Sequence, residues 1–244
     1  MNNGSNHIHR LYNLNLSHRG IAICLLVVQV LRIPIGALLR SPMCCLVTMV
    51  FVFIELSVII KAPAEFCSSI HTLVLDGRWQ NLIMSHFCHL NEWHMYHNLT
   101  GFVRHAVWVE VLVGWRSSLV VFIHLMVRSQ ILHLFINHLL YILTEDEAYS
   151  KDCFIGISGL VFAINVLSNL SVKGAWEFQL TTGRVFRIPK AAIAWCDLFL
   201  IQFPVPTSSL VGHLAGVLAG LSYQSTFFKR YGPIQQDMEI RESD

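Results

Sequence analysis

The chain has few charged side chains. Only 13% of its 244 residues are Asp, Glu, Lys or Arg, whereas 54% are hydrophobic; soluble domains usually carry about 25% charged residues. A disordered chain is excluded because disorder requires low hydrophobicity and high charge. A soluble domain would need many more charged side chains to cover so apolar a core. The composition therefore favours a polytopic membrane protein.

Three other patterns are missing. The Lys and Arg residues form no basic run, so the sequence offers no surface for nucleic acid. The seven cysteines follow no regular spacing and mostly lie in apolar runs, so we expect buried free thiols instead of a disulfide scaffold. Residues 1–15 are polar and no apolar segment begins before about Ile21, so we expect no cleaved secretory leader.

The apolar residues gather in segments of roughly the length that crosses a bilayer, which is about 20 residues. Six segments qualify, namely 43–60, 94–113, 118–143, 154–172, 191–203 and 208–228. A seventh, 21–39, contains Arg32 and Pro34, so we expect an interfacial or embedded helix there and leave an extra span open. The fold class predicted is all-α, a polytopic membrane protein with a six-helix bundle.

The basic residues give this bundle an orientation, because cytosolic loops are enriched in Lys and Arg. With a cytosolic amino terminus, the opposite side holds only Lys61, Arg78 and Lys151. We therefore expect residues 1–42 to form a cytosolic amino-terminal segment, 43–228 the six-span domain, and 229–244 a short cytosolic tail. The first loop, 61–93, is expected to pack beside the bundle.

A short motif of small residues, Gly156-Ile157-Ser158-Gly159, opens the fourth segment. A serine hydroxyl is a weak nucleophile unless a base removes its proton, and small neighbours leave this hydroxyl accessible. Taken alone the motif is weak evidence, because a serine in a membrane helix more often bonds a backbone carbonyl.

The last segment carries Gly216 and Gly220, a small-x-x-x-small stripe that lets two helices pack closely. His213 lies on the same face, one turn before Gly216. Helix packing alone would explain the stripe. A close-packed face that also presents an imidazole can supply a base to Ser158. We expect valine at either glycine to abolish activity, and alanine to be milder, especially at Gly220.

The third motif consists of two polar residues, His94 and Asn98, which lie four residues apart on one face of the second segment. Amide hydrolysis creates an oxyanion that needs preorganised hydrogen-bond donors. An imidazole N–H and a carboxamide NH₂ can serve, and the backbone N–H of Ser158 can add a third.

Together the three motifs resemble the signature motifs of rhomboid intramembrane serine proteases, in the family's order and across about residues 43–228. The resemblance implies a Ser158–His213 dyad, an oxyanion held by His94 and Asn98, and no cofactor or metal. It implies membrane-protein substrates, single-span or polytopic, within the lipid bilayer. Several stretches look closest to the family's endoplasmic-reticulum branch, which implies a multi-pass protein of that membrane with both termini in the cytosol.

The resemblance also implies close helix packing around the site. The residues concerned are Gly156, Gly159, Phe162, Gly216 and Gly220. The family often has Tyr where this chain has Phe162, which can stack on the imidazole without a hydroxyl.

At two other positions the chain departs from the family, with Asn81 where Arg is common and Gly212 where Ala is common. The endoplasmic-reticulum branch has a long cytosolic tail with partner-binding motifs, so quality-control partners stay open for a chain that ends at Asp244. The fifth segment, followed by Pro204 and Pro206, is expected to be a lateral gate for a helical substrate.

Other functions were weighed against this one. The second segment and the loop before it hold possible metal ligands, namely His86, Cys88, His89, His94 and His97. Without a His-Glu-x-x-His helix we expect no metal, and Asp197 is not needed as a third catalytic residue.

The main alternative is a catalytically inactive rhomboid-like protein that binds membrane clients in protein quality control. The presence of both Ser158 and His213 argues against it. A transporter would usually show an internal repeat, and none is visible.

Overall fold

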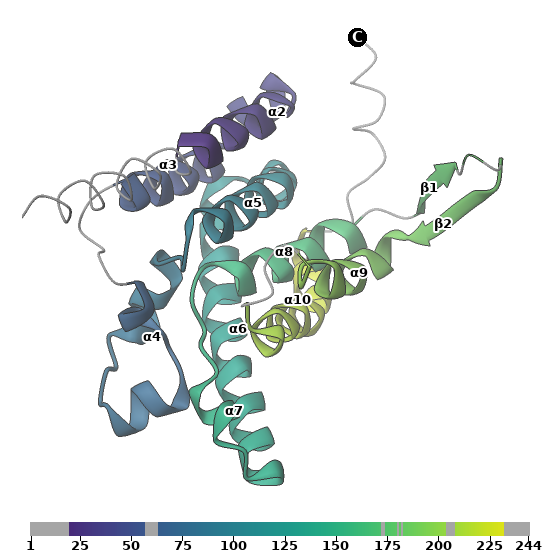
Figure 1. Cartoon of the computed structure of the whole chain (residues 1–244). Coiled ribbons are helices and arrows are strands. Elements are labelled where there is room, and N and C mark those ends of the chain that lie inside the picture. Colours follow the sequence, from purple (N-terminus) through teal and green to yellow (C-terminus); the bar gives the residue numbers. More distant parts are fainter. Residues whose placement is uncertain are drawn as a thin grey trace, which may run out of the picture.

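The computed structural model describes residues 20–56, 63–171, 174–179, 181, 183–203 and 208–231, and this part of the chain is mostly helical (Figure 1). Each of the six predicted segments overlaps one of the main helices. These are α3 (Pro42–Leu56), α5 (Glu92–Val113), α6 (Trp115–Thr144), α8 (Ser158–Leu170), α9 (Ile193–Leu200) and α10 (Leu210–Tyr231).

Judged by length and composition alone, one helix within the described residues, α6, is long and apolar enough to cross a membrane. Shorter apolar helices cover Gly20–Leu31, Pro42–Ile54 and Ser158–Leu170. The count of six spans therefore stays a prediction. The fifth segment is shorter than predicted, because eight residues of α9 rise only about 12 Å at ~1.5 Å per residue. Pro204 and Pro206 lie outside the described residues.

The segment predicted to be interfacial or embedded, 21–39, is a broken helix. One helix covers Gly20–Leu31 and a second, α2, covers Ile35–Leu39. The break falls at Pro34, which lacks a backbone N–H and disfavours helical geometry in the residue before it. The cytosolic segment predicted before Gly20 and most of the tail predicted for 229–244 lie outside the described residues.

Helix α8 occupies the centre of the bundle, and most of its length is buried. It packs against α5, α6, α9 and α10 (Figure 1). Its apolar side chains Leu160, Ile164 and Leu167 are almost completely buried. Because Ser158 begins this helix, the serine is held inside the protein by packing on several sides.

The carboxylate of Glu110, near the end of α5, is fully buried and binds the start of another helix. It accepts hydrogen bonds from the backbone N–H groups of Met43, at 2.8 Å, and of Cys44, at 2.7 Å. The first N–H groups of a helix have no partner within the helix, so Glu110 satisfies two of those of α3. This contact fixes α3 to α5.

Short helical turns fill the loops on either side of α5 and α6. They are η1 (Pro63–Phe66), η2 (His71–Leu75), α4 (Asn81–Met84), η3 (Ser85–Phe87) and α7 (Glu147–Lys151). Asn81, at the departure from the family pattern, is buried. Its amide donates to the carbonyls of Glu65, at 2.9 Å, and Cys67, at 2.7 Å. It therefore holds the first loop together without the usual Arg.

The all-α prediction was wrong for the basic loop after α8. Strands β1 (Ala175–Gln179) and β2 (Val185–Pro189) form an antiparallel hairpin, with Ala175 opposite Pro189. An ion pair of 2.8 Å between Arg187 and Glu177 joins the two strands. Another short helix, η4 (Lys190–Ala192), connects the hairpin to α9. The basic character of the segment hid the β-branched and aromatic residues Val185, Phe186 and Ile188, which suit a strand.

The expectation of free thiols was wrong for two cysteines. Cys67, in the first loop, and Cys153, just before α8, form a disulfide with a Cα–Cα distance of 5.4 Å. The other five cysteines form no disulfide. Spacing could not reveal this pair because α5 and α6 separate its members along the chain. The predicted spans agree with the bond, because two helices that each crossed the membrane would return the chain to its starting side.

We predict that this disulfide stabilises the protein. Replacing both Cys67 and Cys153 with Ser should lower the free energy of unfolding by about 2–4 kcal/mol, because an 86-residue separation is then left unconstrained in the unfolded chain. Thermal unfolding in detergent measures the change. The matched control is Cys24→Ser, which alters an exposed free thiol. Equal melting temperatures for the double variant and the control would contradict the prediction.

Candidate active site

Ser158 lies at a sharp turn that leads into α8. Gly156 has φ +91° and Ile157 forms the N-cap of the helix. The serine is 9% exposed. The N–H groups in the first turn of a helix lack partners within the helix and concentrate positive potential there. The turn thus presents the hydroxyl beside backbone donors.

His94 and Asn98 of α5 lie against this turn. A Cβ atom added to Gly156 would lie 2.8 Å from Nδ2 of Asn98 and 3.3 Å from Cε1 of His94. The positive φ favours glycine, and the space that a Cβ would need is taken by the two polar side chains. Gly156 therefore has two functions, since it makes the turn and admits both side chains.

Both side chains present a donor without a partner. Nε2 of His94 and Nδ2 of Asn98 are buried and make no hydrogen bond to any other described residue. The Leu90 backbone N–H donates to Nδ1 of His94 at 3.4 Å, so a neutral His94 carries its proton on Nε2. Buried donors that lack a partner are costly and call for an explanation.

His213 is buried in the first turn of α10. The ring of Phe162 stacks on it, with ring centroids 4.6 Å apart and an angle of 30° between the planes. Its Nδ1 lies 3.5 Å from Nε2 of Gln202. Among the hydrogen bonds of the described residues, none joins His213 to Ser158. Catalytic hydrogen bonds are often long without substrate and tighten when it binds.

Gly216 and Gly220 bring α10 into backbone contact with α8. A Cβ at Gly216 would lie 2.5 Å from the Gly159 carbonyl oxygen and 2.8 Å from Cβ of Phe162. A Cβ at Gly220 would lie 2.6 Å from the carbonyl oxygen of Ala163. The glycine face of α10 therefore lies on the serine helix, with His213 at its end.

Gly159 is equally crowded on its other side. A Cβ there would lie 2.7 Å from the Ser129 hydroxyl of α6 and 2.9 Å from the Phe154 ring. Helix α8 is thus packed closely on two sides in the turn that carries the serine.

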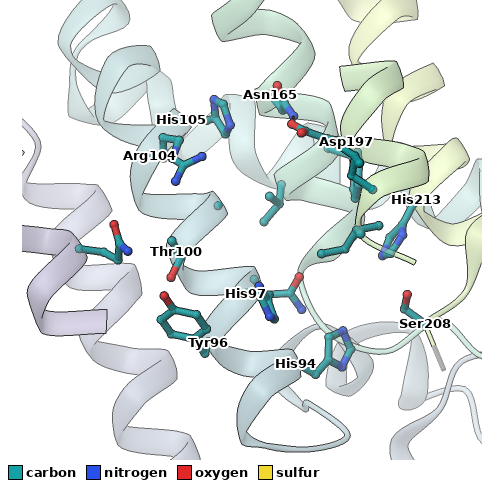
Figure 2. A pocket seen from close by; sticks show the side chains of 17 residues that line it. His94, Tyr96, His97, Thr100, Arg104, His105, Asn165, Asp197, Ser208 and His213 are labelled. Carbon is teal, nitrogen blue, oxygen red and sulfur yellow. Dashed lines mark hydrogen bonds between the residues drawn. The ribbon is translucent and has the colours of Figure 1, made fainter. Parts of the chain in front are cut away.

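A cavity of about 360 Å³ opens beside these residues, between α5, α8, α9 and α10. His94 and His213 lie at one end of it, and Arg104 and Asp197 lie at the other (Figure 2). Asp197 accepts a hydrogen bond of 2.8 Å from Asn165 and none from His213. A smaller cavity of about 60 Å³ is lined by Ser158, and His94 and Ser208 line both cavities.

The first-loop histidines have structural contacts. Nε2 of His86 lies 3.0 Å from Oε1 of Gln130, and the His89 ring packs edge-on against those of Phe51 and His94. Burial lowers the pKa of His86 to about 4, although its contact with Gln130 acts in the opposite direction. Within the described part of the chain, no three His, Cys, Asp or Glu side chains gather as metal ligands would.

Two residues that hold the site together gave no signal in the sequence. Gln130 of α6 donates to the hydroxyls of Ser68, at 3.0 Å, and Ser85, at 3.4 Å. The Ser85 carbonyl in turn accepts the Gly156 N–H at 2.8 Å. Asp152, in a loop that the sequence presents as merely acidic, binds both α6 and the start of α10.

The rhomboid domain, as defined for that family, matches residues 76–230, a range that contains His94, Asn98, Ser158 and His213 and every residue that lines the two cavities except Gln29. The chain belongs to the rhomboid family. The resemblance inferred from the three motifs is thereby confirmed, and rhomboid membership also supports an integral membrane protein.

The chain is similar to Rhomboid-related protein 4 of Mus musculus, with 28% identity over 223 residues, or 91% of this chain and 67% of the relative. With the Homo sapiens protein of that name it shares 28% identity over 173 residues, 71% of this chain and 52% of the relative. With Rhomboid-like protein 14, mitochondrial, of Arabidopsis thaliana it shares 29% identity over 154 residues, 63% of this chain and 45% of the relative. The chain thus spans about half to two thirds of these relatives.

We predict that even alanine is poorly tolerated at Gly216 and Gly220, although, as expected from the sequence, its effect should be milder than that of valine. A single Cβ already overlaps a backbone carbonyl of α8, which cannot move without shifting the helix. Each alanine variant should lose about 1–3 kcal/mol of stability, and valine should lose more. Protease resistance in detergent at rising temperature measures this loss.

The matched control is Gly36→Ala in α2, where an added Cβ meets nothing within 4 Å. Wild-type stability of Gly216→Ala and Gly220→Ala would show that α8 and α10 are not in backbone contact.

Proposed function

We propose that the protein is an intramembrane serine endopeptidase that cleaves membrane proteins in or near their transmembrane segments. The observation that supports this most is the turn before Ser158. Two unpartnered donors, on His94 and Asn98, meet there beside a serine at the start of a helix. A buried set of unpaired donors beside a hydroxyl suits the stabilisation of an oxyanion.

In the proposed reaction, His213 removes the proton of the Ser158 hydroxyl, and the oxygen attacks a peptide carbonyl of the substrate. His213 then gives that proton to the leaving amine. Water, deprotonated by His213, attacks the acyl-enzyme and restores the free serine. The stacked Phe162 ring restricts the orientation of the His213 imidazole. Proton transfer requires the imidazole to lie within ~2.6–3.2 Å of the Ser158 hydroxyl.

The negative oxygen of the tetrahedral intermediate would be held by Nε2–H of His94, Nδ2–H of Asn98 and the backbone N–H of Ser158. The Leu90 bond to Nδ1 selects the His94 tautomer that can donate. No metal or cofactor takes part in these steps. The positive end of α8 adds to the stabilisation of the negative charge.

The cavity between α5 and α9 would receive the substrate from the bilayer. Helix α9 is short, which fits a gate that moves more readily than a full span. Single-span and polytopic membrane proteins are the proposed substrates. Partners in quality control are not assigned.

We further propose that the protein lies in the endoplasmic reticulum membrane with both termini in the cytosol. The Cys67–Cys153 disulfide supports an oxidising environment for the loops that bear it, as expected on the side opposite the cytosol.

The dyad provides the direct test. Co-expression with a tagged single-span protein that has helix-weakening residues near its non-cytosolic end should give a shorter fragment. Ser158→Ala and His213→Ala should each abolish the fragment, and the double variant should lose no more than either single one. Equal expression and membrane insertion are the control. Undiminished cleavage by either variant would contradict the dyad, and binding without cleavage by the wild type would favour an inactive client-binding protein.

Asn98→Ala should separate catalysis from stability. Because Nδ2 of Asn98 has no hydrogen-bond partner to lose, the thermal stability should change little. Loss of one oxyanion donor should lower kcat by about 10²–10³-fold. Cleavage kinetics of the purified protein and its melting temperature give the two values. A full-rate Asn98→Ala variant would remove Asn98 from the proposed oxyanion site.

A further inference from the structure

Asp152 binds three side chains, two from α6 and one from the residue just before α10. It ends α7, and its Oδ2 accepts hydrogen bonds from the Ser209 hydroxyl at 2.6 Å and from Nδ2 of Asn137 at 3.0 Å. Nε2 of His133 lies 3.1 Å from the same oxygen. Asn137 and His133 belong to α6, and Ser209 immediately precedes α10. One carboxylate oxygen thus joins three parts of the molecule.

Asp152 is charged at neutral pH. Burial alone would raise the pKa of its carboxyl, but the contacts with His133 and Ser209 outweigh burial and hold the pKa below its usual range. Hydrogen bonds to a charged acceptor are about twice as strong as neutral ones. The 2.6 Å contact with Ser209 is of this kind.

Ser209 transmits this contact to His213. Its hydroxyl oxygen accepts the backbone N–H of Gly212 at 2.8 Å, and its carbonyl accepts the backbone N–H of His213 at 3.1 Å. Ser209 therefore caps α10 while its hydroxyl proton points to Asp152. The position of the turn that carries the proposed base depends on the position of the Asp152 carboxylate.

The chain that follows Asp152 leads directly to the nucleophile. Phe154 exchanges backbone hydrogen bonds with Ser68, and the Gly156 N–H binds the Ser85 carbonyl. Ser158 comes two residues later. The small cavity lined by Ser158 is also lined by Asp152, Ser209 and Gly212. The same carboxylate thus borders the approach to the serine and the start of the histidine helix.

We propose that Asp152 is a positioning residue that fixes the first turn of α10, and with it His213, relative to the turn that carries Ser158. This inference rests on the proposed protease function and names a residue that acts through the dyad. The glycine contacts set the distance between α8 and α10 along their length. Asp152 sets the end of α10 at which proton transfer takes place.

The test measures kcat and KM for cleavage of a fluorogenic transmembrane substrate by the purified full-length protein, per folded molecule. Misplacement of a catalytic group by about 1 Å can cost on the order of 100-fold. We expect kcat to fall about 10-fold in Asp152→Asn and about 100-fold in Asp152→Ala, with KM changed less than about twofold, because the proposed role of Asp152 is to position His213 and not to bind substrate.

Ser209 variants separate positioning from general destabilisation. Ser209→Ala should lower kcat about as much as Asp152→Asn, whereas Ser209→Thr keeps the hydroxyl and should restore most of it. The double variant Asp152→Ala/Ser209→Ala should lose no more than Asp152→Ala, because the two residues act through one contact. If Asp152→Ala does not fold, Asp152→Asn and the Ser209 pair decide the outcome.

The matched control is Asp146→Asn. Asp146 is an exposed aspartate of the same loop that caps α7 through Ala148, and its replacement should leave kcat unchanged. Unchanged kcat per folded molecule in Asp152→Asn and Ser209→Ala would overturn the positioning role of Asp152 but not the proposed function. Additive losses in the double variant would do the same. Absence of any Ser158-dependent cleavage by the wild type would instead overturn the proposed function, and the inference with it.

Discussion

The backbone contact between α8 and α10 is the constraint on which the rest of the site depends. Inside a membrane, lipid is as apolar as the helices, so little hydrophobic force drives them together. Gly216 and Gly220 instead let α10 approach the carbonyls of Gly159 and Ala163. In the proposed mechanism, this approach is what allows Ser158 of α8 and His213 of α10 to act together. A larger side chain at Gly216 or Gly220 would push α8 and α10 apart while leaving the serine and the histidine chemically unchanged.

Polar loops fix the turn before the serine. The Cys67–Cys153 disulfide, the Ser85 bond to Gly156 and the Gln130 side chain attach the first loop to this turn. The loop thus acts as a support for Gly156, which in turn makes room for His94 and Asn98. Contacts from the first loop therefore hold the turn that leads to Ser158 in place.

Sequence motifs located the residues of the candidate site because each motif depends on spacing within one helix. His94 and Asn98 share a face of α5, and His213 and Gly216 share a face of α10, by helical periodicity alone. Contacts between loops could not be predicted in this way. Cys67 and Cys153 are far apart in the sequence, and Asp152 looked like part of a solvated acidic loop. The charged residues of its segment also hid the β1–β2 hairpin. The apolar composition of 191–203 predicted a longer helix than α9.

The most direct measurement of the central claim is covalent labelling of the detergent-solubilised protein with a fluorophosphonate, followed by mass spectrometry of the peptides. A serine activated by a neighbouring base reacts with this reagent, whereas an ordinary serine does not. The account predicts one adduct, on Ser158, that disappears in His213→Ala although Ser158 is still present. Absence of the adduct from the folded wild-type protein, or its persistence in His213→Ala, would contradict the account.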